Sequence, residues 1–153
     1  MGGFVRAVQE AGLPVNGYLV RSVDSTKDAR ALINAIIDEI GPEKFPTGIV
    51  AVNGAAAIGA MGNLVVHDVL IPEEESIIGY DGINYSGLLR VPLTTIYQLK
   101  IKTEVLAARQ PIDTIERGEE GVSRQDLVIP CPVVRKSCRA VQRTERCDTE
   151  AGR

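Results

Sequence analysis

Residues 76–98 read SIIGYDGINYSGLLRVPLTTIYQ, and this stretch decides the fold. The apolar run Ser76 to Tyr80 predicts a strand that delivers Asp81 into a glycine-containing turn. After an irregular loop, the run Pro92 to Ile96 predicts a second strand-like segment. Asp81 therefore stands at the carboxyl end of a strand, which is where ligands bind in open α/β sheets.

The segment before this stretch has the composition of one βαβ unit. Thr47 to Val52 predicts a buried strand, Asn53-Gly54 a turn, and Ala55 to Val66 a helix of small residues. Because neighbouring parallel strands end at the same sheet edge, Asn53 and Asp81 are expected to lie together as ligand-binding residues. An amide and a carboxylate suit a polyhydroxylated ligand. Asn-Gly and Asp-Gly are also common turn dipeptides, and spacing alone leaves function and turn chemistry equally open.

The earlier part of the chain continues the alternation of strands and helices. Gly3 to Ala11 predicts a helix and Tyr18 to Val23 a short strand. A second helix is expected from an N-cap at Asp24 or Ser25 to about Ile40. Its buried side should comprise Ala31, Ile33, Ala35, Ile36, Ile37 and Ile40. This order predicts an α/β domain with a three-layer parallel sheet.

The carboxyl-terminal part should return to the sheet. Leu99 to Arg109 predicts a helix that Pro111 kinks or restarts before it continues to Arg117. Asp126 to Val134 is the last strand candidate, and its two prolines confine it to a sheet edge. Residues 138–153 are charged and are expected to be disordered.

Composition excludes several classes of function. The chain has 153 residues and a formal net charge of −3, so it lacks the excess of basic residues with which a domain holds DNA by itself. No secretory signal precedes the first helix, and a cytoplasmic location is expected. The apolar run Gly48 to Val66 is interrupted by asparagines and glycines, which favours a buried strand and helix over a membrane span.

The other candidates for chemistry are weak. Cys131, Cys138 and Cys147 are odd in number and lack a C-x-x-C pair, so neither a disulfide framework nor a zinc site is predicted. His67 is expected to be a surface residue at a helix end, because no nucleophile is spaced with it. The run Glu73 to Glu75 is expected to be a solvated turn. No catalytic residue, metal ligand or cofactor motif is predicted, and the chain is not expected to be an enzyme.

Residues 76–98 resemble a signature of the lactose/galactose repressor family of bacterial transcription regulators. That signature, G-(F/Y)-D-D followed by P-x-L-T-T-(I/V)-x-Q, is matched by Asp81 and by the run Pro92 to Gln98. The run Val52 to Met61 resembles the family's Asn-Asp motif and helix, and Val133 to Ser137 its closing V-x-R-x-S. Gly54 and Gly82 replace two family aspartates, and Glu75 replaces an apolar residue.

The resemblance implies a C-terminal subdomain of a periplasmic-binding-protein-like (type I) fold, in a truncated chain. Residues 1–98 would form the distal effector-binding subdomain, residues 99–125 a helix and connector that pack on a missing first subdomain, and residues 126–137 the returning strand. An exposed apolar patch is therefore expected at Leu99, Val105, Leu106 and Ile112. The family's arginine that contacts effector would lie upstream of Met1.

The resemblance also implies a function, namely the effector-sensing and dimerisation portion of a transcription regulator. Its effector would be a sugar or nucleoside-like molecule bound by Asn53 and Asp81, and operator DNA would be contacted only through a head missing from this chain. A homodimer is expected, with candidate interface residues Ile58, Met61, Tyr85, Leu88 and Leu89; core packing is the alternative for Ile58 and Met61. The alternative functions are a sugar-binding module without a DNA role and a non-functional remnant.

Overall fold

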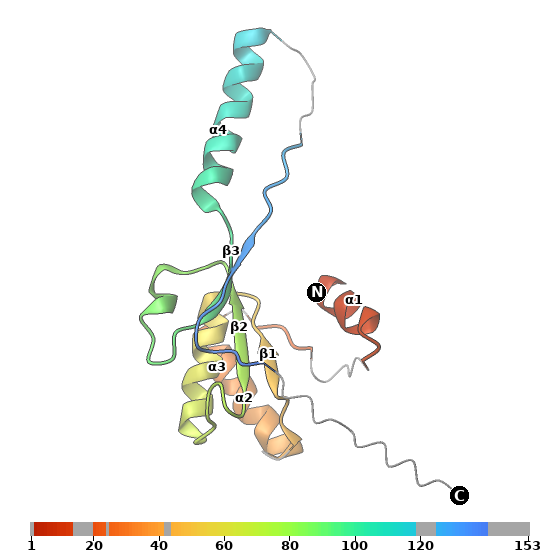
Figure 1. The fold of residues 1–153 in the computed structure, drawn as a ribbon, viewed down its shortest axis with the longest axis vertical. Coiled ribbons are helices and arrows are strands. Elements are labelled where there is room, and N and C mark those ends of the chain that lie inside the picture. Colours follow the sequence, from red (N-terminus) through yellow and green to blue (C-terminus); the bar gives the residue numbers. More distant parts are fainter. Residues whose placement is uncertain (1, 14–19, 24, 42–43, 119–124, 141–153) are drawn as a thin grey trace, which may run out of the picture.

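A mixed four-stranded sheet organises the computed structural model, which describes residues 2–13, 20–23, 25–41, 44–118 and 125–140. The strand order is β1 (Gly48–Val50), β2 (Ser76–Tyr80), β3 (Thr94–Tyr97) and β4 (Cys131–Val133) (Figure 1). β1, β2 and β3 are parallel, and β4 pairs antiparallel with β3 at the edge. The predicted α/β class is thus confirmed, and β4 with Pro132 occupies the edge that its prolines require.

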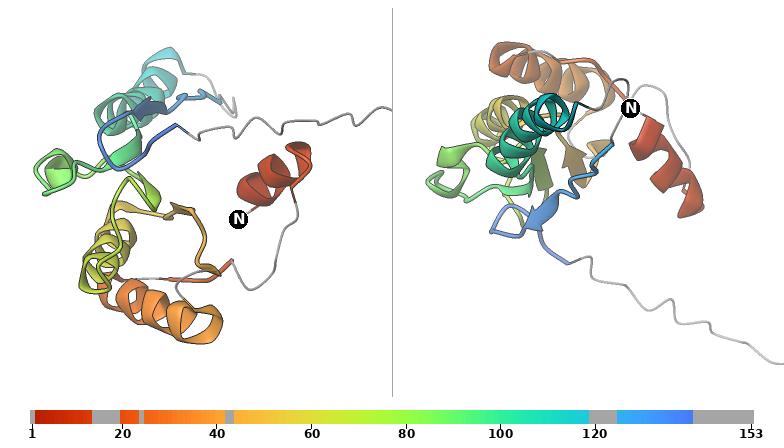
Figure 2. Two further views of the ribbon diagram at one scale, coloured as in Figure 1. Left: turned by 60° about the horizontal axis from the view of Figure 1, so that its bottom comes forward. Right: turned by 90° about the horizontal axis from the view of Figure 1, so that it is seen from above.

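Helices α2 (Thr26–Ile40) and α3 (Gly54–Val66) pack against each other on one face of the sheet (Figure 2). Gly59 permits this approach, because a Cβ there would collide with the carbonyl oxygen of Thr26 and lie 2.9 Å from the Cβ of Ala29. Ala57, Leu64, Ile77 and Leu93, which are fully buried, belong to the core between these helices and the sheet. The predicted helix bounds are confirmed to within a residue or two.

The opposite face of the sheet is less covered than the sequence predicts. Val50 and Val52 on β1 and just after it are 64% and 65% exposed, so the prediction of a buried strand is wrong. Residues 20–23 form no ladder, although a strand was predicted over Tyr18 to Val23, whose first two residues lie outside the described ranges. Helix α1 (Gly2–Glu10) contains no buried residue. The described residues therefore form two layers, and the predicted third layer is not complete.

The last helix, α4 (Lys100–Arg117), extends away from the sheet (Figure 1). It includes Pro111 within one continuous helix, so of the predicted kink or restart the restart is wrong, and none of its residues is buried. Val105 and Ile112 are 55% and 54% exposed, as the expected apolar patch requires, whereas Leu99 and Leu106 are half-buried. A hydrogen bond of 3.0 Å from Gln110 to Asp126 joins α4 to the returning segment.

The segment after β4 closes the sheet with side-chain hydrogen bonds. Buried Ser137 accepts a hydrogen bond of 2.8 Å from the backbone N–H of Thr94 and donates one of 2.5 Å to the carbonyl of Ile77. Arg135 donates to the carbonyl oxygen of Leu93 at 2.6 Å and to the hydroxyl of Ser86 at 3.1 Å. These bonds tie the returning segment to β2, to the loop after β2 and to the start of β3, so the returning segment is part of the fold. Residues 141–153, most of the tail expected to be disordered, lie outside the described ranges.

Candidate functional site

The parallel register brings Asn53 and Asp81 to the same edge of the sheet. Gly48 aligns with Ser76 and Val50 with Ile78, and the backbone N–H of Ala51 donates to Ile78 at 2.8 Å just beyond the strand. Continuing this register by three residues places Asn53 opposite Asp81, and paired strands lie about 4.8 Å apart. The predicted alignment of the two polar residues at the strands' carboxyl ends is therefore consistent with the sheet.

Asn53 acts as the N-cap of α3. Its Oδ1 accepts a hydrogen bond of 2.8 Å from the backbone N–H of Ala56, and its backbone is extended, as an N-cap requires. The turn chemistry that the sequence left open is thus present. The Nδ2 donor has no hydrogen-bond partner among the described residues, and the side chain is half-buried at the sheet edge. Asn53 can therefore cap the helix and donate to a ligand at the same time.

Asp81 is held in an unusual backbone conformation. Its φ is +76°, in the left-handed region that costs a non-glycine residue roughly 1 kcal/mol, and Gly82 follows with φ +58°. The half-buried side chain accepts a hydrogen bond of 3.0 Å from Nε2 of Gln98, which follows β3. This bond to Oδ1 fixes the carboxylate and leaves Oδ2 available. Gln98, which sequence reasoning treated only as a motif residue, is therefore a positioning residue for Asp81.

Bulky side chains fill the space beside Gly54 and Gly82, the two positions at which the resemblance described above implies aspartates. A Cβ on Gly54 would lie 2.7 Å from Ile83 Cδ1, and a Cβ on Gly82 would collide with Cδ2 of the Tyr97 ring. Ile83 and Tyr97 thus occupy the volume that a longer residue at these positions would need. Sequence reasoning recorded the lost carboxylates but missed the two side chains that take their place.

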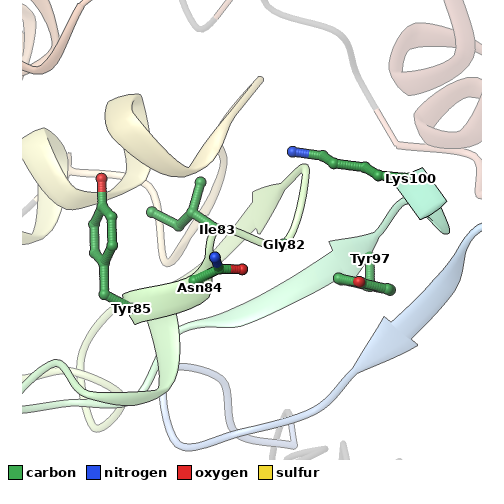
Figure 3. A pocket seen from close by; sticks show the side chains of 6 residues that line it. All are labelled: Gly82, Ile83, Asn84, Tyr85, Tyr97 and Lys100. Atoms are coloured by element: carbon green, nitrogen blue, oxygen red, sulfur yellow. The ribbon is translucent and has the colours of Figure 1, made fainter. Parts of the chain in front are cut away.

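An open hollow of about 350 Å³ begins at Gly82, the residue that follows Asp81 in the chain (Figure 3). Its lining residues come from the loop after β2, the end of β3 and the start of α4: Gly82, Ile83, Asn84, Tyr85, Tyr97 and Lys100. Lys100 is the one charged residue of this lining. The hollow was not predicted, because its residues are separated in the sequence and carry no motif.

The predicted interface residues fall into two groups. Tyr85 and Leu88, in the loop that contains the short helix η3 (Asn84–Gly87), are 55% and 85% exposed. Leu89 is half-buried and packs against the core cluster, and Ile58 on α3 is also half-buried. Met61 is only 7% exposed and belongs to the core cluster, so for this residue the alternative of core packing is correct.

Two of the weaker candidates have defined structural surroundings. His67 ends α3 at the surface, as expected, with Nε2 2.7 Å from Oδ1 of Asn34. The prediction that Glu73 to Glu75 form a solvated turn is wrong for Glu75, which is only 4% exposed. Burial and then the charge of Glu74 raise the pKa of Glu75 from 4.5 to about 7.

Neither a metal centre nor a membrane span emerges from the described ranges. No three His, Cys, Asp or Glu side chains there come together as a metal site. Cys131 and Cys138 are free thiols, and Cys147 lies outside the described residues. No helix in these ranges combines the length and apolar composition needed to cross a bilayer.

Comparison with known proteins assigns the fold. Residues 1–138 match the periplasmic binding protein-like domain. The chain belongs to this family. Among curated relatives, the HTH-type transcriptional repressor PurR of Haemophilus influenzae is 31% identical over 142 residues, which cover 91% of this chain and 41% of that protein. The chain therefore spans less than half the length of the curated relative it matches.

Solved structures that are similar to this chain include transcription regulators. A regulator from Lactobacillus plantarum superposes with a TM-score of 0.79 at 25% identity, covering 89% of this chain and 51% of that one. A LacI family regulator from Arthrobacter sp. FB24, solved in complex with lactose, gives a TM-score of 0.75 at 25% identity and covers 88% and 48%. These findings confirm the predicted resemblance to the lactose/galactose repressor family. The curated relative is a repressor rather than an enzyme, in agreement with the expectation from the sequence.

Proposed function

We propose that this chain is the effector-sensing and dimerisation portion of a DNA-binding transcription regulator. The observation that carries the proposal is the placement of Asn53 and Asp81 at one sheet edge, with a donor and an acceptor atom available. The regulator of Arthrobacter sp. FB24 with bound lactose supports a small-molecule effector for this family. With a net charge of −3, the chain would act on operator DNA through a separate DNA-binding part rather than by its own surface.

The two side chains have complementary roles toward a sugar or nucleoside-like effector. Oδ2 of Asp81 would accept from a ligand hydroxyl, while the bond from Gln98 holds the carboxylate in place. Nδ2 of Asn53 would donate to a hydroxyl oxygen, and the cap bond to Ala56 fixes the amide plane. Effector binding at this edge would shift the balance between two conformations of the regulator, because only one of them completes these hydrogen bonds.

The loop after β2 is the proposed dimer contact. Leu88 and Tyr85 present apolar surface to solvent there, and a second copy of the chain would bury it together with the neighbouring surface of Ile58 and Leu89. Burying one leucine side chain contributes about 2 kcal/mol, and a symmetric dimer buries one from each copy, so Leu88→Asp should raise the dimer dissociation constant by roughly several hundredfold. Sedimentation velocity measures this change. An unchanged dissociation constant would show that the loop is not part of the interface.

Two conservative variants test the effector site. Asn53→Asp keeps an oxygen for the cap bond but removes the amide donor, and Asp81→Asn keeps an acceptor for Gln98 but removes the carboxylate charge. Binding of a panel of sugars and nucleosides is followed by calorimetry on the 153-residue chain. We expect each variant to lose about tenfold in affinity with little change in stability. Asp38→Asn, exposed on α2, is the control; equal affinity in all four proteins would refute the site.

A further inference from the structure

The hollow that begins at Gly82 has a mostly apolar surface, and the polar side chains among its lining residues include no carboxylate. Lys100 contributes an ammonium, Asn84 an amide, and Tyr85 and Tyr97 a phenol each, while Gly82 and Ile83 are apolar (Figure 3). Lys100 is exposed, and among the described residues no carboxylate lies within 4.0 Å of its ammonium. Nor do described residues supply hydrogen-bond partners to the side chains of Asn84, Tyr85 or Tyr97. The hollow therefore carries a positive charge and several unused donors.

The hollow adjoins the proposed effector site through the backbone. Gly82, which lines the hollow, directly follows Asp81, and Tyr97 directly precedes the Gln98 that holds Asp81. The ring of Tyr97 fills the space beside Gly82, so a side chain on residue 82 cannot enter without displacing the ring. The Asp81 carboxylate is not part of the hollow's lining. One ligand could thus reach Asp81 with its hydroxyls and the hollow with another group.

We propose that this hollow is a subsite for an anionic group, a phosphate or a carboxylate, carried by the effector. The inference rests on the proposed function and narrows its ligand class to acidic derivatives of sugars or nucleosides. Lys100 pairs with the anion, and the Asn84 amide and the Tyr97 hydroxyl donate to its oxygens. A neutral polyol leaves the ammonium without a partner. An anionic ligand is therefore preferred over its neutral parent.

The size of the preference follows from the exposure of the lysine. A solvated ion pair of this kind contributes a factor of about three to five in affinity, and hydrogen bonds from neutral donors raise the total to about tenfold. Salt screens such a contact, so the preference should shrink as ionic strength rises.

Calorimetric or NMR titration of the 153-residue chain with matched ligands tests the proposal. The sets are glucose, glucuronate and glucose 6-phosphate, and adenosine with adenosine monophosphate. We expect the anionic member of each set to bind about tenfold tighter than its parent. Preference for glucuronate or for glucose 6-phosphate then distinguishes a carboxylate from a phosphate subsite.

Lys100→Gln should lower affinity for the anionic ligands about three- to fivefold and leave the neutral ligands unchanged. Lys102→Gln is the matched control, because Lys102 is exposed on the same helix but does not line the hollow. Equal losses in the two variants would show a general charge effect and overturn the subsite. Neutral ligands that bind as tightly as anionic ones would also overturn it while leaving the proposed function intact. If no member of either set binds at millimolar concentration, both proposals fail.

Discussion

Glu75 should make the stability of this fold fall as pH rises from 4.5 to about 7. Its side chain is only 4% exposed, and its Oε2 has no hydrogen-bond partner among the described residues. Burial, with a smaller contribution from Glu74, raises its pKa from 4.5 to about 7. Below 4.5 the group is protonated in both the folded and the unfolded chain, so it causes no pH dependence there. Between 4.5 and about 7 the unfolded chain loses the proton first, and the free energy of unfolding falls.

The size of the effect follows from the shift. Each pKa unit corresponds to about 1.36 kcal/mol, so the shift from 4.5 to about 7 amounts to roughly 3 kcal/mol, fully lost above neutrality. The free energy of unfolding of an ordinary domain is roughly 5 to 15 kcal/mol, so this loss is a large fraction of it. The carboxyl group of Glu75 is therefore expected to contribute strongly to the pH profile between about 4.5 and about 7.

Urea unfolding between about pH 5 and about pH 8 measures this profile. Glu75→Gln removes the ionisation, so its unfolding free energy should lack the decline and exceed that of the parent chain most at the alkaline end. Glu73→Gln, at an exposed position in the same turn, should retain the decline. A parent chain whose stability is flat over this range, or a Glu75→Gln variant with the same slope, would refute the reasoning.

Three further substitutions test contacts that position the site, each by urea unfolding. Gly82→Ala should lower the free energy of unfolding by about 2 to 4 kcal/mol, because φ is +58° and the new Cβ meets the Tyr97 ring. The double variant with Tyr97→Ala should lose at least about 1 kcal/mol less than the sum of the two single losses. A double variant whose loss equals that sum would disprove the collision. Gly59→Ala should destabilise the α2 and α3 contact by about 2 kcal/mol or more, whereas Gly62→Ala on the same helix, with open space around it, should stabilise by about 0.5 kcal/mol. Ser137→Ala removes two buried hydrogen bonds and should cost about 1 to 3 kcal/mol; a change below about 0.5 kcal/mol would mean that the closing segment is dispensable.

Local patterns were sufficient to predict the elements that pack on the described core. The apolar run Ser76 to Tyr80 became β2 with the predicted bounds, and α3 begins one residue before its predicted start. Both have a periodicity and a cap or turn residue that fix them locally. The exposed face of β1 could not be predicted, because Val50 and Val52 have the composition of a buried strand. Whether another layer covers such residues is a property of tertiary packing rather than of the local sequence.

In the candidate site, too, the features set by local sequence could be predicted and the contacts between remote residues could not. The alignment of Asn53 with Asp81 followed from two strands of known direction, so it was accessible to sequence reasoning. The filling of space beside Gly54 by Ile83 and beside Gly82 by Tyr97 joins residues that are remote in the chain. A glycine next to a strand end is a weak signal by itself. The side chain that fills the space beside the glycine is known only once the fold places the loop after β2 and the end of β3 side by side.

Asn53 can cap a helix and bind a ligand at the same time, so the two interpretations of this residue are compatible. Its Oδ1 caps α3. The same hydrogen bond fixes the orientation of the amide group, and therefore the direction in which Nδ2 can donate. Serine or aspartate would supply the cap oxygen equally well, so capping alone does not require asparagine at this position. Asparagine is the side chain of this size that accepts with one atom and donates with the other. The helix cap thus preorganises a donor at the sheet edge, and the entropy of fixing it is already lost before a ligand arrives. A ligand site of the kind proposed would therefore need only a short polar pattern in the sequence.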